Sequence, residues 1–279
     1  MGVTALVLTA FLLAASAGSL EHDLRVLRSS TVREKVFDAA VRVAGSGDAK
    51  ALEKLGDLLA SRAFLARLDE TSDPQLAVLN VRRVFLALAD KPSAMTEALC
   101  LKVMIADAFL DGPERLSYVL QALATVRPMS SATAAEFEKM NGRGYWSFNG
   151  PFLAANGSDR AVAILECMFA DRAQNRDDRV DLARESIVPN RTQPGILAMV
   201  GRLVEGRVEN DVALALAETI FDHQPDRWYG KRRNPPQAPS WKTASPAAQR
   251  AATELGRRLL ARKDLPAALR TAIEDTLRF

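Results

Sequence analysis

Apolar residues along the chain recur at intervals of three and four positions, and no stretch alternates steadily between apolar and polar residues. The first spacing puts apolar side chains on one face of an α-helix, whereas alternation would indicate a β-strand. The connections between these stretches are short and contain Gly, Pro, Asn and Asp. Short connections are typical of antiparallel helical hairpins, so the pattern predicts an all-α fold of about eleven short helices.

Several predicted helices begin with residues that can bond to the free amide groups of a first turn. Thr31–Glu34 and Thr133–Glu136 both have the Thr-x-x-Glu spacing of a capping box. Asp48 precedes another apolar stretch and is a favoured N-cap residue. Two longer loops are predicted between the helices, at residues 140–152 and 224–243.

Two helix starts have a related pattern of residues. The segments SDRAVA (158–163) and DDRVDLA (177–183) both combine Asp and Arg with Val and Ala in short successive hairpins. In this they resemble the HEAT and armadillo class of α-solenoids. The resemblance implies stacked helix pairs in a curved array, one helical-repeat domain over residues 18–279, and the binding of other macromolecules on an extended surface. The alternative fold is a compact bundle of irregular helices.

The first seventeen residues have the pattern of a secretory signal peptide. Val3–Ala17 is an uncharged and mainly apolar run, and Ala15-Ser16-Ala17 supplies a small-x-small cleavage pattern. We therefore expect a signal peptide over residues 1–17, cleavage after Ala17, and export to the periplasm or the medium without stable membrane insertion. The alternative is an uncleaved anchor or a buried first helix.

The charge of the chain is nearly balanced. It contains 37 Lys and Arg residues against 34 Asp and Glu residues, which gives a formal net charge of +3. Both signs are interspersed along the sequence, so the chain lacks the global positive field with which nucleic-acid binders release counterions. We expect no nucleic-acid partner.

Residues suited to catalysis or metal binding are few. Cys100 and Cys167 lie in apolar helical stretches, which predicts two buried thiols, although export would also permit one disulfide. His22 and His223 are the only histidines, which is too few for a multi-histidine metal centre. The sequence also contains no Gly-x-Ser-x-Gly motif and no phosphate-binding loop. We expect no catalytic residues, no metal site and no cofactor.

The aromatic residues are concentrated in the two longer loops. These loops contain all three tryptophans and two of the three tyrosines, and the second loop adds three consecutive cations and several prolines. Arg and Lys beside Trp are suited to cation–π contacts and to the capture of anions. The alternative role of the aromatic rings is to anchor the loops in grooves between helices. The candidate binding residues are Arg143, Tyr145, Trp146, Trp228, Tyr229, Lys231, Arg232, Arg233 and Trp241.

These patterns predict an exported, non-catalytic helical-repeat protein that acts as a protein-binding or scaffold module, with another protein as its partner. The alternative is an envelope enzyme that acts on an anionic polymer. In that case the basic aromatic loop would bind the substrate, and Glu136, Asp222 or Asp226 would carry out acid–base work. A third interpretation is a stabilising subunit of a larger complex, which would expose an extended apolar helix face.

Overall fold

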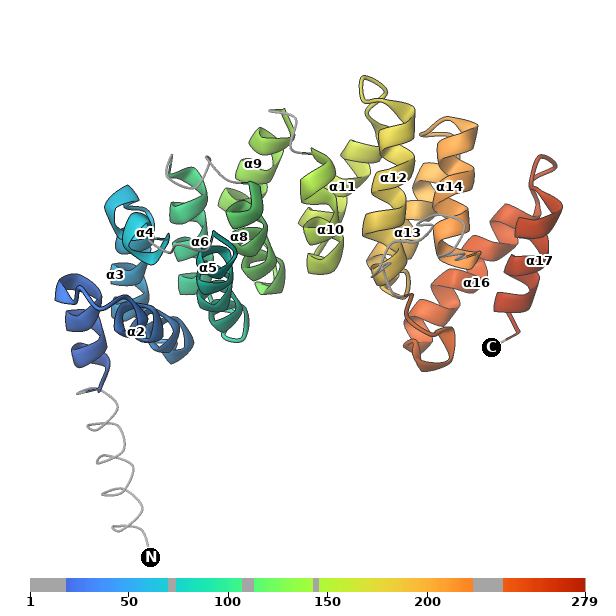
Figure 1. Cartoon of the computed structure of the whole chain (residues 1–279). Coiled ribbons are helices and arrows are strands. Elements are labelled where there is room, and N and C mark those ends of the chain that lie inside the picture. Colours follow the sequence, from blue (N-terminus) through green and yellow to red (C-terminus); the bar gives the residue numbers. More distant parts are fainter. Residues whose placement is uncertain (1–18, 70–73, 107–112, 143–145, 223–237, 279) are drawn as a thin grey trace, which may run out of the picture. The chain divides into compact units, whose positions relative to one another are not determined.

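In the computed structural model, the described part of the chain is all-helical and contains no strand (Figure 1). The predicted all-α class is therefore confirmed. No helix among the described residues is both long enough and apolar enough to cross a membrane. The predicted signal peptide lies outside them, so its cleavage remains a prediction. The described residues are 19–69, 74–106, 113–142, 146–222 and 238–278.

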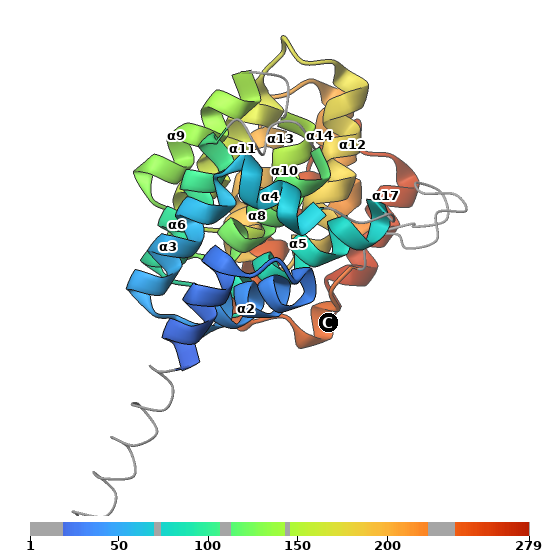
Figure 2. The same ribbon diagram turned by 60° about the vertical axis from the view of Figure 1, so that its left-hand side comes forward.

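The contacts within the chain divide it into two compact units, Met1–Val126 and Arg127–Phe279. In the first unit, α2 packs against α5 and α5 against α8, while α3 packs against α6 (Figures 1 and 2). Buried Leu52 and Leu55 of α3 and Phe85 and Leu88 of α5 belong to its core. The helices of this unit are a segment at 19–29, α2 (Arg33–Ser46), α3 (Ala49–Leu59), α4 (Arg62–Asp69), α5 (Pro74–Ala89), α6 (Ala94–Ile105) and α8 (Pro113–Thr125).

The helices of the second unit form two rows. In one row α10 packs against α12, α12 against α14 and α14 against α17, and in the other α11 packs against α13 and α13 against α16. From α10 to α14, consecutive helices therefore alternate between the rows. The elements of this unit are α9 (Ser131–Met140), α10 (Trp146–Asn156), α11 (Asp159–Ala170), α12 (Arg176–Ile187), η2 (Val188–Asn190), α13 (Pro194–Val204), α14 (Asn210–Phe221), η3 (Trp241–Thr243), α16 (Pro246–Leu260) and α17 (Ala267–Thr276).

The predicted helix starts are partly confirmed. The side chain of Asp48 accepts a hydrogen bond of 2.8 Å from an amide in the first turn of α3, as an N-cap does. The predicted capping boxes are wrong. Ser130 accepts the amide of Thr133 and makes that threonine a buried residue inside α9. Ser30 bonds to the amide two residues further on, and α2 begins after Thr31 without a side-chain cap. In both places a serine upstream of the predicted threonine accepts the backbone hydrogen bond: Ser130 is the N-cap of α9, and Ser30 bonds to the amide of Val32 just before α2.

The predicted loop at 140–152 is also partly wrong, because α10 begins at Trp146 and contains Pro151. A proline in a helix removes one backbone hydrogen bond, and a glycine lowers helix propensity, so together they indicated a loop. Gly150, however, lies where α10 approaches α12 closely. A β-carbon at this position would lie 2.2 Å from Cδ1 of Leu182. The glycine is required by helix packing rather than by a turn.

Candidate functional site

Most of the predicted binding residues fall outside the described part of the chain. Trp241 is described completely, and the backbone of Trp146 forms the start of α10. For the second loop, the structure describes the two flanks, which end at residue 222 and begin again at residue 238. The predicted residues that lie outside the described ranges are Arg143, Tyr145, Trp228, Tyr229, Lys231, Arg232 and Arg233.

Trp241 is an anchor at the end of this second loop. Its side chain is buried, and its ring is stacked on Phe221 with a centroid distance of 6.5 Å and an interplanar angle of 19°. Its backbone carbonyl accepts a hydrogen bond of 3.1 Å from Nε2 of Gln249 on α16. A buried ring offers little surface to a ligand, so these contacts favour the anchoring role for Trp241 itself.

Arg191 holds the two flanks of the loop together. Its Nη1 donates to the carbonyl of Ile220, at 3.3 Å, and its Nε and Nη2 donate to the carbonyl of Pro239, at 3.1 and 2.9 Å. The guanidinium also lies over the ring of Trp241, 5.5 Å from its centroid. Burial lowers the pKa of Arg191 from its ordinary value, but an arginine keeps its charge in a protein. The carbonyl at the end of α14 and the face of the indole ring stabilise this charge.

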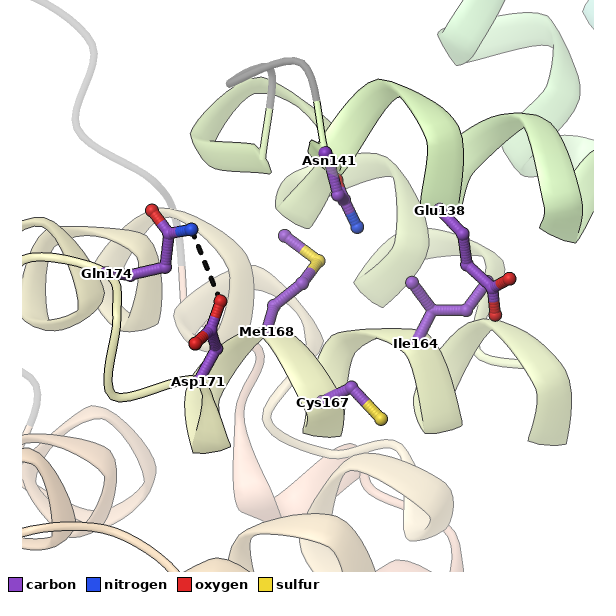
Figure 3. A pocket seen from close by; sticks show the side chains of 8 residues that line it. Glu138, Asn141, Ile164, Cys167, Met168, Asp171 and Gln174 are labelled. Carbon is purple, nitrogen blue, oxygen red and sulfur yellow. Dashed lines mark hydrogen bonds between the residues drawn. The ribbon is translucent and has the colours of Figure 1, made fainter.

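A cavity of about 240 Å³ lies between α9 and α11 (Figure 3). The volume is below the roughly 300–1,000 Å³ of pockets for drug-sized ligands and is suited to a small molecule or one side chain. Asn141 and Met168 point toward each other across it, and Glu138 and Asp171 lie at its two ends (Figure 3). No sequence pattern predicts this cavity, because its walls come from separate elements. The lining residues are Glu138, Asn141, Gly142, Ile164, Cys167, Met168, Asp171 and Gln174.

The two cysteines differ in exposure. Cys100 is buried, as predicted, and burial raises the pKa of its thiol. The prediction of a buried thiol is wrong for Cys167, which is exposed on α11 beside the cavity. The apolar residues around Cys167 extend beyond the buried face of α11. The sequence prediction treated the whole apolar run as buried, and it was therefore wrong for Cys167. Both cysteines are free thiols.

Alkylation of the folded protein with iodoacetamide is expected to modify Cys167 and to leave Cys100 unmodified. A thiolate must reach the reagent, and the Cys100 thiol is both buried and held protonated by its raised pKa. Peptide mass spectrometry of the native and the urea-unfolded protein measures the two sites separately. Equal labelling of both cysteines in the folded protein would contradict this assignment of exposure.

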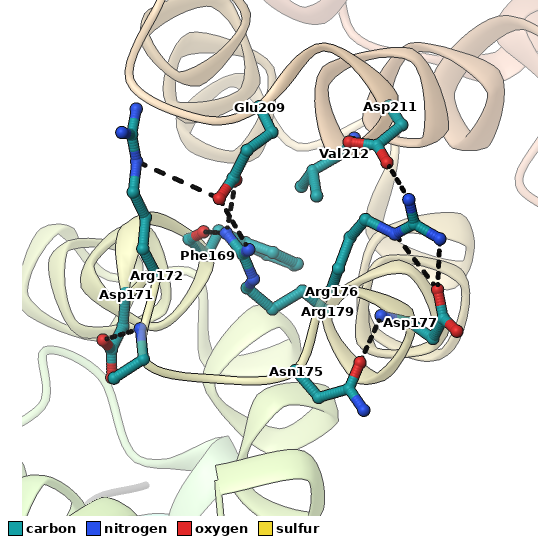
Figure 4. A network of polar contacts seen from close by, with 11 residues as sticks. Phe169, Asp171, Arg172, Asn175, Arg176, Asp177, Arg179, Glu209, Asp211 and Val212 are labelled. Carbon is teal, nitrogen blue, oxygen red and sulfur yellow. Dashed lines mark hydrogen bonds and ion pairs between the residues drawn. The ribbon is translucent and has the colours of Figure 1, made fainter.

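A network of charged groups fixes the segment that forms one end of the cavity (Figure 4). Arg179, only 2% exposed, donates from Nη1 to the carbonyl of Phe169 at 3.1 Å. The same side chain binds the carboxylate of Glu209 through two hydrogen bonds of 2.8 and 3.0 Å. These bonds hold the pKa of Glu209 at about 2. Together they fix the end of α11 and the start of α14 against α12, next to the connection that carries Asp171 and Gln174.

Two of the three carboxylates of the alternative enzyme hypothesis, Glu136 and Asp222, are not among the described residues that line the cavity. Glu136 lies on α9 and pairs with Lys139 at 3.4 Å, and Asp222 is the C-cap residue of α14. Asp226 falls outside the described residues. Within the described ranges, no group of three or more His, Cys, Asp or Glu side chains is arranged to hold a metal ion.

Comparisons of the chain with models of protein families, with curated proteins and with solved structures give no match. The similarity to HEAT and armadillo repeats therefore remains a prediction from the sequence. Two features of the second unit are candidates for a functional role: the contacts of Arg191 with Pro239 and Trp241 at the ends of the second loop, and the cavity between α9 and α11.

Proposed function

We propose that the chain is an exported, non-catalytic helical-repeat protein that binds another protein through the loop at residues 224–243. In this proposal residues 1–17 direct export and are removed, and the remaining chain acts in the periplasm or outside the cell. The packing within the units supports the helical-repeat part of the proposal. Rows of alternate helices are the arrangement through which repeat proteins build extended binding surfaces.

The observation that carries the proposal is the closure of the loop by Arg191. Ile220 and Pro239 both accept hydrogen bonds from this one guanidinium, and Phe221 stacks on Trp241. Bringing the ends of a loop together costs conformational entropy, and here the folded protein provides that closure before a partner arrives.

The residues between the two flanks supply the chemistry of recognition. They include Trp228 and Tyr229, followed by the consecutive cations Lys231, Arg232 and Arg233. Guanidinium groups bind carboxylates in a bidentate manner, and aromatic rings contribute large apolar contacts. A partner with an acidic surface is the chemistry that fits this set.

Replacement of Lys231, Arg232 and Arg233 by Ser is expected to reduce binding of the partner at least tenfold and to leave the melting temperature unchanged. Charged interface groups contribute strongly to binding, whereas exposed charges contribute little to folding. The mature chain from Gly18 onward is used to capture companions from the envelope fraction. The affinity of the captured protein is then measured for each variant, together with thermal melting by circular dichroism.

A matched control removes the same charge elsewhere in the second unit. Arg250, Arg257 and Lys263 are exposed, and their replacement by Ser should leave both binding and melting as in the wild type. Equal binding by the loop variant and the wild type would reject the proposed site. A large fall in melting temperature of the loop variant alone would assign residues 231–233 to folding. Failure of the wild type to retain any companion would reject the binding function.

A further inference from the structure

We draw no further inference here: the strongest candidate, the cavity between α9 and α11, has polar lining side chains that are all at least partly exposed, and nothing in the described part of the chain shows what would bind there.

Discussion

Glu209→Ala is expected to lower the free energy of unfolding by about 2–3 kcal/mol, somewhat less than the loss of one partner of a fully buried ion pair. Glu209 is itself partly exposed, which reduces the effect, but its partner Arg179 is buried. The guanidinium of Arg179 cannot lose its proton, so the variant keeps a buried cation whose remaining bond in the network is to the carbonyl of Phe169. Urea unfolding followed by circular dichroism at pH 7 measures the loss.

Two further variants separate this effect from a general loss of surface charge. Asp211→Ala breaks the exposed pair with Arg176, of 2.9 Å, and should change stability too little to resolve. The double variant Arg179→Met with Glu209→Ala removes both charges of the buried pair. It should be more stable than Glu209→Ala alone, since an apolar side chain is tolerated where an unpaired cation is not. A double variant no more stable than the single one would contradict the explanation.

The pH dependence of the free energy of unfolding is an independent test of the Arg179–Glu209 pair. The pKa of Glu209 is lowered from 4.5 to about 2 in the folded protein, chiefly by its hydrogen bonds with Arg179. The folded state therefore binds this proton less readily than the unfolded state does, so the contribution is complete above pH 4.5 and is lost as the pH falls toward 2. The difference in stability between the wild type and Glu209→Gln should shrink over this interval.

The fold class was predictable because helix periodicity is a local property of the sequence. A one-sided apolar pattern reports which face of a helix is buried, and a residue such as Asp48 reports where a helix begins. The error at the start of α9 arose where two local signals competed. Ser130 and Thr133 are both good N-cap residues, and the pattern alone did not show which of them the backbone would use.

The base of the candidate binding loop and the cavity were not predictable from the sequence. Arg191 and Pro239 are 48 residues apart, and nothing near Arg191 identifies it as the partner of a distant carbonyl. The cavity requires α9 and α11 to be placed side by side, which depends on packing across the unit. Sequence patterns located the aromatic and basic residues, and only tertiary contacts showed that Trp241 is an anchor.

The packing of α10 against α12 leads to the second large expected effect, in Gly150→Ala. The new β-carbon would lie 2.2 Å from Cδ1 of Leu182 and 2.7 Å from Oγ of Ser186. Both neighbours are buried, so neither can turn into solvent to make room. Overpacking of this kind costs about 1–3 kcal/mol, and it exceeds the gain of up to about 1 kcal/mol that alanine brings to a helix. Urea unfolding at pH 7 measures the net loss.

The control is Gly45→Ala, in which a β-carbon at a helical glycine of α2 meets no atom within 4 Å. It should leave stability unchanged or raise it, because only helix propensity changes. Leu182→Val removes the atom that clashes, so the double variant with Gly150→Ala should lose less stability than the sum of the two single variants. Additive losses would mean that Gly150 and Leu182 do not compete for the same space. The close approach of α10 and α12 would then not explain why a glycine occurs within α10.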